Sequence, residues 1–520
     1  MDHVGVIYGN VGITEFKFAV SDPTLKRTDY IKVQHDREGW VLAQVMDVVR
    51  ETSLSFDEAT AMSHGVDQVI EDRLTAKAKV VGYRDPRGIL QSTKTPFRAG
   101  IPVYRADEAL IMEVFGLRGG KDEGAYIGFI KGYDIPVTLD INTLVQKHVS
   151  VLAKTGSGKS YVVGVLMEEL MKRDVPIVVI DPHGEHDSLA HPNLNSDDFP
   201  GLRRFHLKPR GFADRIMKYS PDPKVNADAM PLKVAGLNLK AQDIVDLLGS
   251  KITNAQMGIL HQCVKTLQES AERYTLEDII VQVKNHQSNA KWNLASGLEF
   301  LLSLDLFDEK GTPLPNLVKK GKVTVVCLKG VSPDVQEIVV AKLIKGLFEA
   351  RKVNKIPPFM LVVEEAHNFC PERSVAGAAM SGDSIRTVAS EGRKFGMGLT
   401  IISQRPAKID KNVLSQCNTQ IILKVTNPND LKAISASVEG LTADIEDEIQ
   451  RIPVGVAIVS HPTLAVPAFV EVRPRETQHG GRSVDVLHYN SDDLAAHEEP
   501  PAPLPVRSRP APAPVAPAPE

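Results

Sequence analysis

The residues best suited to do chemistry lie in the segment VLAKTGSGKSYVV, residues 151–163. Gly156 and Gly158 allow positive φ angles and a close backbone approach, and Lys159 and Ser160 follow them. In such a loop the backbone N–H groups bind phosphate, the lysine reaches the β and γ phosphates, and the hydroxyl ligates Mg²⁺. We therefore predict a binding loop for ATP and Mg²⁺ made of Lys154, Thr155, Gly156, Ser157, Gly158, Lys159, Ser160 and Tyr161.

The usual phosphate-loop pattern begins with a glycine, and this chain has Ala153 at that position. Ala153 lies at the end of a predicted strand, where ordinary extended dihedral angles suffice. A positive φ at an alanine would cost roughly 1–2 kcal/mol. The mismatch therefore weakens the pattern without refuting it. The alternative, a glycine-rich turn with a chance lysine, is disfavoured by the apolar strand before the loop and the helical pattern after it.

Two adjacent carboxylates follow the apolar segment FMLVV, residues 359–363. A buried strand of this kind delivers Glu364 and Glu365 to the carboxyl edge of a parallel sheet, where ligands bind. Because side chains alternate along a strand, the two carboxylates cannot both point the same way. We expect Glu364 to support the Mg²⁺ shell and Glu365 to polarise the attacking water. The alternative is that both carboxylates only cap a helix that begins at Ala366.

Two further predicted strand ends carry polar residues. Gln404 ends the strand in TIISQRP, where it either senses the γ phosphate and orients water or serves as a turn residue. The segment DPHGEH places Asp181, His183 and Glu185 just past another strand. These residue types can ligate a metal, although a hydrogen-bonded loop is the commoner outcome for such a segment.

Two arginines in SIRTVASEGRKFGMG are candidates for a role between subunits. Arg386 and Arg393 are seven residues apart, so they share one face if the predicted helix is unbroken. An arginine that reaches a neighbour's γ phosphate makes hydrolysis depend on assembly. Most surface arginines have no such role, and the residues alone leave open whether Arg386 acts on a neighbour.

The pattern of apolar residues changes along the chain and predicts its organisation. Short strands separated by turn signals indicate a small β barrel or sandwich in residues 1–140, with a short helix near 55–65. Apolar runs alternating with helices then predict an α/β core with a mainly parallel sheet, residues 141–237 and 308–474. Helical spacing of apolar residues predicts an inserted helical bundle in 238–307, where Thr275 and Asp278 resemble a capping box.

The end of the chain has a different composition. From about residue 475 the chain turns polar, which suggests a C-terminal extension over 475–490. Residues 491–520 are rich in proline and alanine and cannot bury a core, so we expect a disordered, extended tail.

Composition limits the partners and the compartment. Lysine and arginine number 61 against 65 acidic residues, so the net charge of −4 excludes a polycation, and contacts to DNA must come from a local patch or a pore lining such as 119–124 or 318–324. Four dispersed cysteines without a CxxC pair argue against a zinc site and a disulfide framework. No uncharged stretch reaches the length of a bilayer. We expect a cytoplasmic protein without a membrane segment.

Taken together, these motifs resemble those of the HerA family over about residues 1–490. The resemblance rests on the order KTGSGKSY, IDPHGEH, helical insert, VVEEAHNF, EGRKFGMGLTIISQRP and SQCNTQIILKVTNPNDL. HerA proteins are hexameric ATPases that pump DNA and belong with the FtsK-like branch of RecA-fold motors. The resemblance implies a RecA-like P-loop core, an N-terminal barrel of the type found in HerA and some ATP synthase subunits, a homo-hexamer, and duplex DNA in a central pore.

The family also implies roles for residues at matching motif positions. Lys159 and Ser160 bind nucleotide and Mg²⁺, and the glutamate pair forms the Walker B site. Gln404 acts as a sensor, and Arg393 of EGRKF serves the catalytic site of the neighbouring subunit. Many members carry a second basic residue just ahead of the phosphate-loop strand, matched here by Lys147 or His148; lysine lacks the planar fork of arginine.

The implied partner is a NurA-type nuclease docked on the barrel end of the ring, and the implied pathway is DNA double-strand-break end resection. The leading hypothesis is thus an ATP-driven translocase that feeds duplex DNA to a nuclease. One alternative is a DNA or protein pump for conjugation or secretion, a class that commonly carries membrane anchors. Another is an ATP-gated scaffold that moves nothing; it would still work with Glu365→Gln, whereas a motor would stall.

Overall fold

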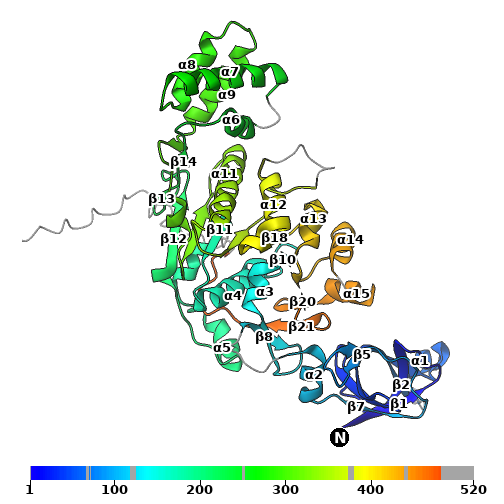
Figure 1. Ribbon diagram of the computed structural model, residues 1–520. Coiled ribbons are helices and arrows are strands. Elements are labelled where there is room, and N and C mark those ends of the chain that lie inside the picture. The colour runs from blue at the N-terminus through cyan, green and yellow to red at the C-terminus, as the bar shows by residue number, and fades with distance from the viewer. Residues whose placement is uncertain are drawn as a thin grey trace, which may run out of the picture. The chain divides into compact units, whose positions relative to one another are not determined.

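In the computed structural model, six N-terminal strands form a closed antiparallel barrel (Figure 1). The strand order runs from β2 through β1, β7, β3 and β4 to β5, and β5 pairs back with β2. Alternating side chains fill the interior, as Phe16 and Phe18 do in β2. The barrel strands are β1 (His3–Tyr8), β2 (Glu15–Val20), β3 (Tyr30–His35), β4 (Gly39–Thr52), β5 (Asp72–Arg84) and β7 (Pro102–Arg105), and the short β6 (Leu90–Gln91) pairs with the end of β5. The structure describes residues 2–65, 70, 72–117, 124–248, 252–372, 380–438 and 443–481.

The short helix expected near residues 55–65 is α1 (Phe56–Ser63), which lies between β4 and β5 in the chain. Ser55 and Glu58 form a reciprocal capping box at its start, which explains where the helix begins. A second helix, α2 (Glu108–Phe115), follows the barrel strands and ends at Gly116, whose φ of 75° suits a left-handed cap.

A twelve-stranded sheet forms the core that follows the barrel. Its order is β13-β12-β16-β11-β17-β18-β10-β19-β20-β21-β8-β9. The strands from β13 to β19 are parallel, and the remaining ones are antiparallel. Their bounds are β8 (Ala125–Ile130), β9 (Pro136–Leu139), β10 (Val149–Leu152), β11 (Ile177–Asp181), β12 (Ile216–Ser220), β13 (Met230–Pro231), β16 (Val323–Cys327), β17 (Phe359–Val363), β18 (Met397–Ser403), β19 (Thr419–Ile422), β20 (Val456–Ser460) and β21 (Ala468–Val472). The predicted α/β class with a mainly parallel sheet is confirmed, and β8, which the sequence placed among the barrel strands, pairs with β21 instead.

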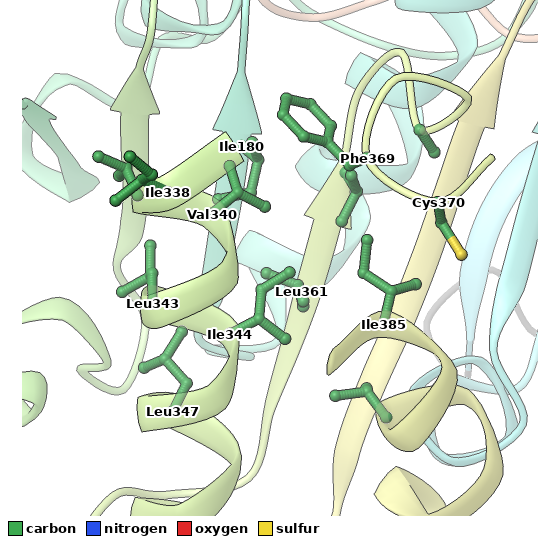
Figure 2. Packing of buried hydrophobic residues seen from close by; sticks show 14 of the residues in the cluster. Ile180, Ile338, Val340, Leu343, Ile344, Leu347, Leu361, Phe369, Cys370 and Ile385 are labelled. Carbon is green, nitrogen blue, oxygen red and sulfur yellow. The ribbon is translucent and has the colours of Figure 1, made fainter. Parts of the chain in front are cut away.

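Helices cover both faces of the parallel part of the sheet. Successive residues of a strand belong to different apolar clusters: Val178 and Ile180 face one cluster, and Val179 faces the other. Figure 2 shows Ile344 of α11 lying toward Leu361 of β17 in the first cluster. The helices of the core are α3 (Ile141–Gln146), α4 (Lys159–Lys172), α5 (Phe199–Arg204), α10 (Leu314–Leu317), α11 (Pro333–Lys352), α12 (Met380–Phe395), α13 (Lys411–Ser415), α14 (Pro428–Ser437) and α15 (Ala443–Arg451). Burial on both faces explains why these strands are continuously apolar.

The predicted helical insert is confirmed. It consists of α6 (Ala241–Leu248), α7 (Asn254–Ser270), α8 (Leu276–Asn285) and α9 (Lys291–Ser303) (Figure 1). The capping box of Thr275 and Asp278 is present at the start of α8. Two short parallel strands, β14 (Val234–Ala235) and β15 (Phe307–Asp308), pair where the chain enters and leaves the insert. None of the helices among the described residues is both long and apolar enough to cross a bilayer.

Beyond β21 the chain packs against α4. The guanidinium of Arg473 donates to Glu168 at 2.9 Å and to Glu169 at 2.8 Å, and all three side chains are buried. The N–H of Thr477 donates to the other oxygen of Glu168 at 2.9 Å. The polar composition of this segment therefore does not keep it on the surface, because α4 supplies buried carboxylates that satisfy its donors. The proline-rich residues 491–520 lie outside the described residues.

Candidate functional site

The predicted phosphate loop joins β10 to α4 at the carboxyl edge of the parallel strands. Gly156 and Gly158 have φ angles of 75° and 93°, so both adopt the conformation that glycine permits, and Gly158 caps the N-terminus of α4. Ala153 is buried, does not take a positive φ, and donates its N–H to the carbonyl of Ser403 at 3.2 Å. The alanine is therefore unstrained. The side chains of Lys154 and Thr155 are exposed at the mouth of the loop.

Residues from three neighbouring strand ends meet over this loop. The ammonium group of Lys159, at the first position of α4, forms an ion pair with Oε1 of Glu365, which follows β17. The hydroxyl of Thr155 donates to the amide oxygen of Gln404, which follows β18. The structure thus brings the predicted loop, the second carboxylate and the predicted sensor to one place. The ammonium group of the lysine and the carboxylate of the candidate base thus pair with each other.

Glu364 turns to a different partner, a histidine that the sequence reasoning did not select. Nε2 of His186 lies 3.1 Å from Oε1 of Glu364, without the alignment of a hydrogen bond, and both side chains are buried. Burial disfavours the charged imidazole, but Glu364 and Asp181 raise the pKa of His186 to about 9. Burial likewise opposes ionisation of Glu364, but the charge of His186 lowers the pKa of that carboxyl. The pair is therefore an ion pair at neutral pH.

The segment DPHGEH forms the hydrogen-bonded loop that was the commoner expectation. The carboxylate of Asp181 accepts the N–H groups of His183, Gly184 and His186 at 3.2, 2.8 and 3.0 Å. His183 is exposed. Asp181 instead lies with His186 and Glu364, and ligand atoms of these three residues are within 4.8 Å of one another, a spacing that could hold a divalent cation. The only sequence signal for His186 was its place at the end of the motif.

Glu365 also has a histidine partner that the sequence reasoning missed. Nδ1 of His367 lies 3.3 Å from Oε2 of Glu365 and 3.2 Å from Oγ of Ser403. Burial lowers the pKa of His367 below its usual value, although the negative charge of Glu365 opposes that shift. The spacing of two residues in EEAH was the available signal, and no motif rule assigns it a role.

The two candidate arginines have different surroundings. The helix α12 is continuous from Met380 to Phe395, so the expected spacing of two turns exists. The guanidinium of Arg386 donates to Asp410 at 2.7 Å and to Asp383 at 2.8 Å, which commits it to its own chain. Arg393 is exposed near the end of the helix. Its side chain is therefore the one available to a neighbouring subunit.

The two residues that match the family's second basic position, Lys147 and His148, also differ in their surroundings. His148 is buried within its own chain: its Nε2 donates to the carbonyl of Ala389 at 3.1 Å, and its Nδ1 accepts the N–H of Leu399 at 3.0 Å. Lys147 is half-buried. Of the two residues, only Lys147 keeps a side chain that can reach outward.

The last two loop residues mark the start of α4. Ser160 is partly exposed in its first turn, where its hydroxyl can face a bound nucleotide. The hydroxyl of Tyr161 accepts the N–H of Arg475 at 2.9 Å, so this side chain contacts the C-terminal segment. The backbone of Tyr161, and not its ring, is the part free for nucleotide.

The chain is similar to several known proteins. Residues 125–347 match the family model described as the central domain of helicase HerA. The chain is 25% identical to the DNA double-strand break repair helicase HerA of Pyrococcus furiosus, over 94% of this chain and 96% of the relative. It is 28% identical to the protein of the same name from Saccharolobus solfataricus, over 79% of this chain and 80% of the relative. Among solved structures, VirB4 of Thermoanaerobacter pseudethanolicus matches with a TM-score of 0.49 and 14% identity over 67% of this chain and 96% of that chain.

The matched region includes the phosphate loop, the DPHGEH loop and the helical insert. The match to the Pyrococcus furiosus relative extends well beyond this region, since it covers 94% of the chain. The closed N-terminal barrel and the parallel sheet with its phosphate loop agree with the fold that the motifs imply. The chain is thus similar to the HerA helicases in its central domain and, in the Pyrococcus furiosus relative, over 94% of its length.

Proposed function

We propose that this protein is an ATP-driven DNA translocase that works as a homo-hexameric ring, moves duplex DNA through its central pore and delivers it to a NurA-type nuclease during double-strand-break end resection. The observation that carries the proposal is the meeting of the phosphate loop, Glu365 and Gln404 at one sheet edge. The relatives' names, which specify double-strand break repair, support the role in DNA repair. The motif resemblance supports the ring, the pore and the nuclease.

In the proposed reaction, the loop from Lys154 to Tyr161 binds the phosphates of ATP through its N–H groups and the N-terminus of α4. Lys159 exchanges Glu365 for the β and γ phosphates. Glu365 then accepts a proton from water while the water oxygen bonds to the γ phosphorus and the bond to the bridging oxygen of ADP breaks. Gln404 senses the γ phosphate beside Thr155.

The hydroxyl of Ser160 and the carboxylate of Glu364 fit a magnesium ion. Oε1 of Glu364 faces Nε2 of His186 at 3.1 Å without an aligned hydrogen bond, so a metal or its water would share this oxygen with the imidazole. Oxygen donors of this kind are those that Mg²⁺ takes in nucleotide sites. When bound, the ion would neutralise charge on the β and γ phosphates.

The test is ATP turnover measured with and without duplex DNA over a series of salt concentrations. We expect DNA to raise the rate and the stimulation to fall steeply with salt, because phosphate contacts release counterions. Glu365→Gln should bind ATP but hydrolyse it very slowly. The control is Glu391→Gln, at an exposed position of α12, which should hydrolyse ATP at the wild-type rate. A rate that DNA leaves unchanged at every salt concentration would overturn the motor, and DNA-dependent function retained by Glu365→Gln would favour a scaffold.

A further inference from the structure

His367 occupies the space between two strand ends of the site. It follows β17 by four residues, and its Nδ1 faces both Oε2 of Glu365 at 3.3 Å and Oγ of Ser403 at 3.2 Å. Ser403 is the last residue of β18 and stands directly before the proposed sensor Gln404. The Oγ of Ser403 also accepts the N–H of Arg405 at 2.9 Å, which fixes its position. One imidazole thus links the candidate base to the strand of the sensor.

The backbone of Glu365 makes such a link necessary. Its φ is +47°, in the left-handed region that non-glycine residues rarely adopt. The turn is held by the N–H of Asn368, which donates to the carbonyl of Glu365 at 2.8 Å, and by the N–H of Ala366, which donates to Ile402 at 3.0 Å. Such conformations persist where surrounding contacts determine them, and they cluster at functional sites. The backbone sets where the carboxylate starts, and side-chain contacts must set where it points.

Lys159 cannot be the lasting partner of this carboxylate. Its ammonium group pairs with Oε1 of Glu365, but the proposed reaction requires it at the phosphates. Once the lysine leaves, Oε1 is free for water. Oε2 has no aligned hydrogen-bond donor among the described residues, and Nδ1 of His367 lies 3.3 Å from it.

We propose that His367 is the positioning residue of Glu365: its Nδ1–H turns from Ser403 to Oε2 of Glu365 when Lys159 moves to the phosphates, and so keeps Oε1 directed at the attacking water. The inference rests on the proposed function, of which it concerns only the hydrolytic step. The proposal assigns His367 the tautomer with its hydrogen on Nδ1, and in that tautomer Nδ1–H can donate to Ser403 or to Glu365 but not to both at once. Loss of the lysine's charge makes the carboxylate the stronger acceptor, because hydrogen bonds to ionised groups are the stronger ones.

The test is single-turnover ATP hydrolysis by the full chain without DNA, combined with the affinity for a fluorescent ATP analogue. We expect His367→Ala to lower the hydrolysis rate about 10- to 100-fold, the range for losing one hydrogen bond to a charged group, with analogue affinity unchanged within about twofold. His367→Asn should recover part of the rate, since its amide N–H takes the place of Nδ1–H. His261→Ala, at an exposed histidine of α7, is the control and should match the wild type.

An unchanged rate for His367→Ala would overturn the proposal, and so would equal losses in His367→Ala and His367→Asn accompanied by weaker analogue binding. If His367→Ala lowers the thermal midpoint, Ser403→Ala provides the second test: it removes the competing acceptor and touches neither carboxylate. We expect it to leave hydrolysis within about threefold of wild type, and a loss as large as that of His367→Ala would contradict the switch. Because these assays contain no DNA, a failed DNA stimulation would overturn the translocase and leave this result standing.

Discussion

The pKa values of three histidines in this chain are set by the groups that surround them. His186 is held between two carboxylates, which raise its pKa and favour its charged form. At His367 burial lowers the pKa by more than the neighbouring carboxylate raises it. His148 is a third case, because it is buried with both ring nitrogens hydrogen-bonded to uncharged backbone groups. Residue type alone predicts the same pKa for all three, so their charge states are decided by neighbours.

His148 makes a prediction about stability and pH. Burial lowers its pKa from 6.5 to about 4, so below pH 6.5 the unfolded chain binds a proton that the folded chain does not. Its contribution to stability is therefore present above pH 6.5 and declines as the pH falls toward about 4, by up to roughly 3 kcal/mol. The urea midpoint of unfolding between pH 7 and pH 4.5 measures this loss.

The matched variants are His148→Gln and His261→Gln. The first removes a titrating group and should flatten the pH dependence, and the second, at an exposed position, should leave it as in the wild type. An identical pH slope for His148→Gln and wild type would contradict the assignment.

Among the elements, α4 is the one that carries the site and is held from two directions. Its N-terminus presents Lys159 and Ser160, and the segment after β21 binds its far turns through Arg473. Arg475 packs over Gly164, where an added Cβ would lie 2.5 Å from the guanidinium carbon. The helix is therefore fixed along its length by a segment that the sequence shows only as polar.

Arg473→Met should destabilise the protein by about 3 kcal/mol or more, because it leaves Glu168 and Glu169 buried without their main cation. The thermal midpoint measures this effect. Arg204→Met is the control: Arg204 pairs with Glu471 at 2.7 Å and is 49% exposed, so its loss should have little effect. Equal shifts for the two variants would show that the buried cluster has no special role.

At the scale of the whole molecule, one chain supplies most of the proposed catalytic groups and leaves one candidate arginine exposed. The arrangement supplies a phosphate loop, a candidate base and a candidate sensor from one chain, and it leaves Arg393 exposed while Arg386 is bound internally. A ring in which each subunit contributes Arg393 to the site of its neighbour would explain why Arg393 is exposed while Arg386 is paired within its own chain.

Arg393→Ala should bind ATP and lose turnover by about 1000-fold or more, as expected for an arginine that acts in transition-state stabilisation. Mixing it with Lys159→Ala subunits should restore part of the turnover, because an intact loop then meets an intact arginine at some interfaces. Steady-state hydrolysis across mixing ratios measures this. Recovery at no ratio would contradict the role between subunits, and Arg386→Ala, which breaks an internal ion pair, should gain nothing from mixing.

Several features followed from the sequence because contiguous residues or a local period carry them. The glycines of the loop, the apolar runs of β10, β11 and β17, and the capping box of α8 depend on neighbours only a few residues away. Glu364 and Glu365 turn to different partners as expected, but they do so in the turn after β17, where the φ of Glu365 is +47°, and not through alternation along a strand.

Only the tertiary structure decided the contacts between segments that lie far apart in the chain. The closure of β2 on β5, the placement of β8 beside β21, and the histidine partners of the two glutamates join segments whose spacing carries no period. The same holds for the burial of Arg473 on α4, since a charged residue enters the interior only where another element supplies its counter-charge. The sequence by itself determined that a phosphate loop and two carboxylates exist, and the tertiary structure determined which groups hold them in place.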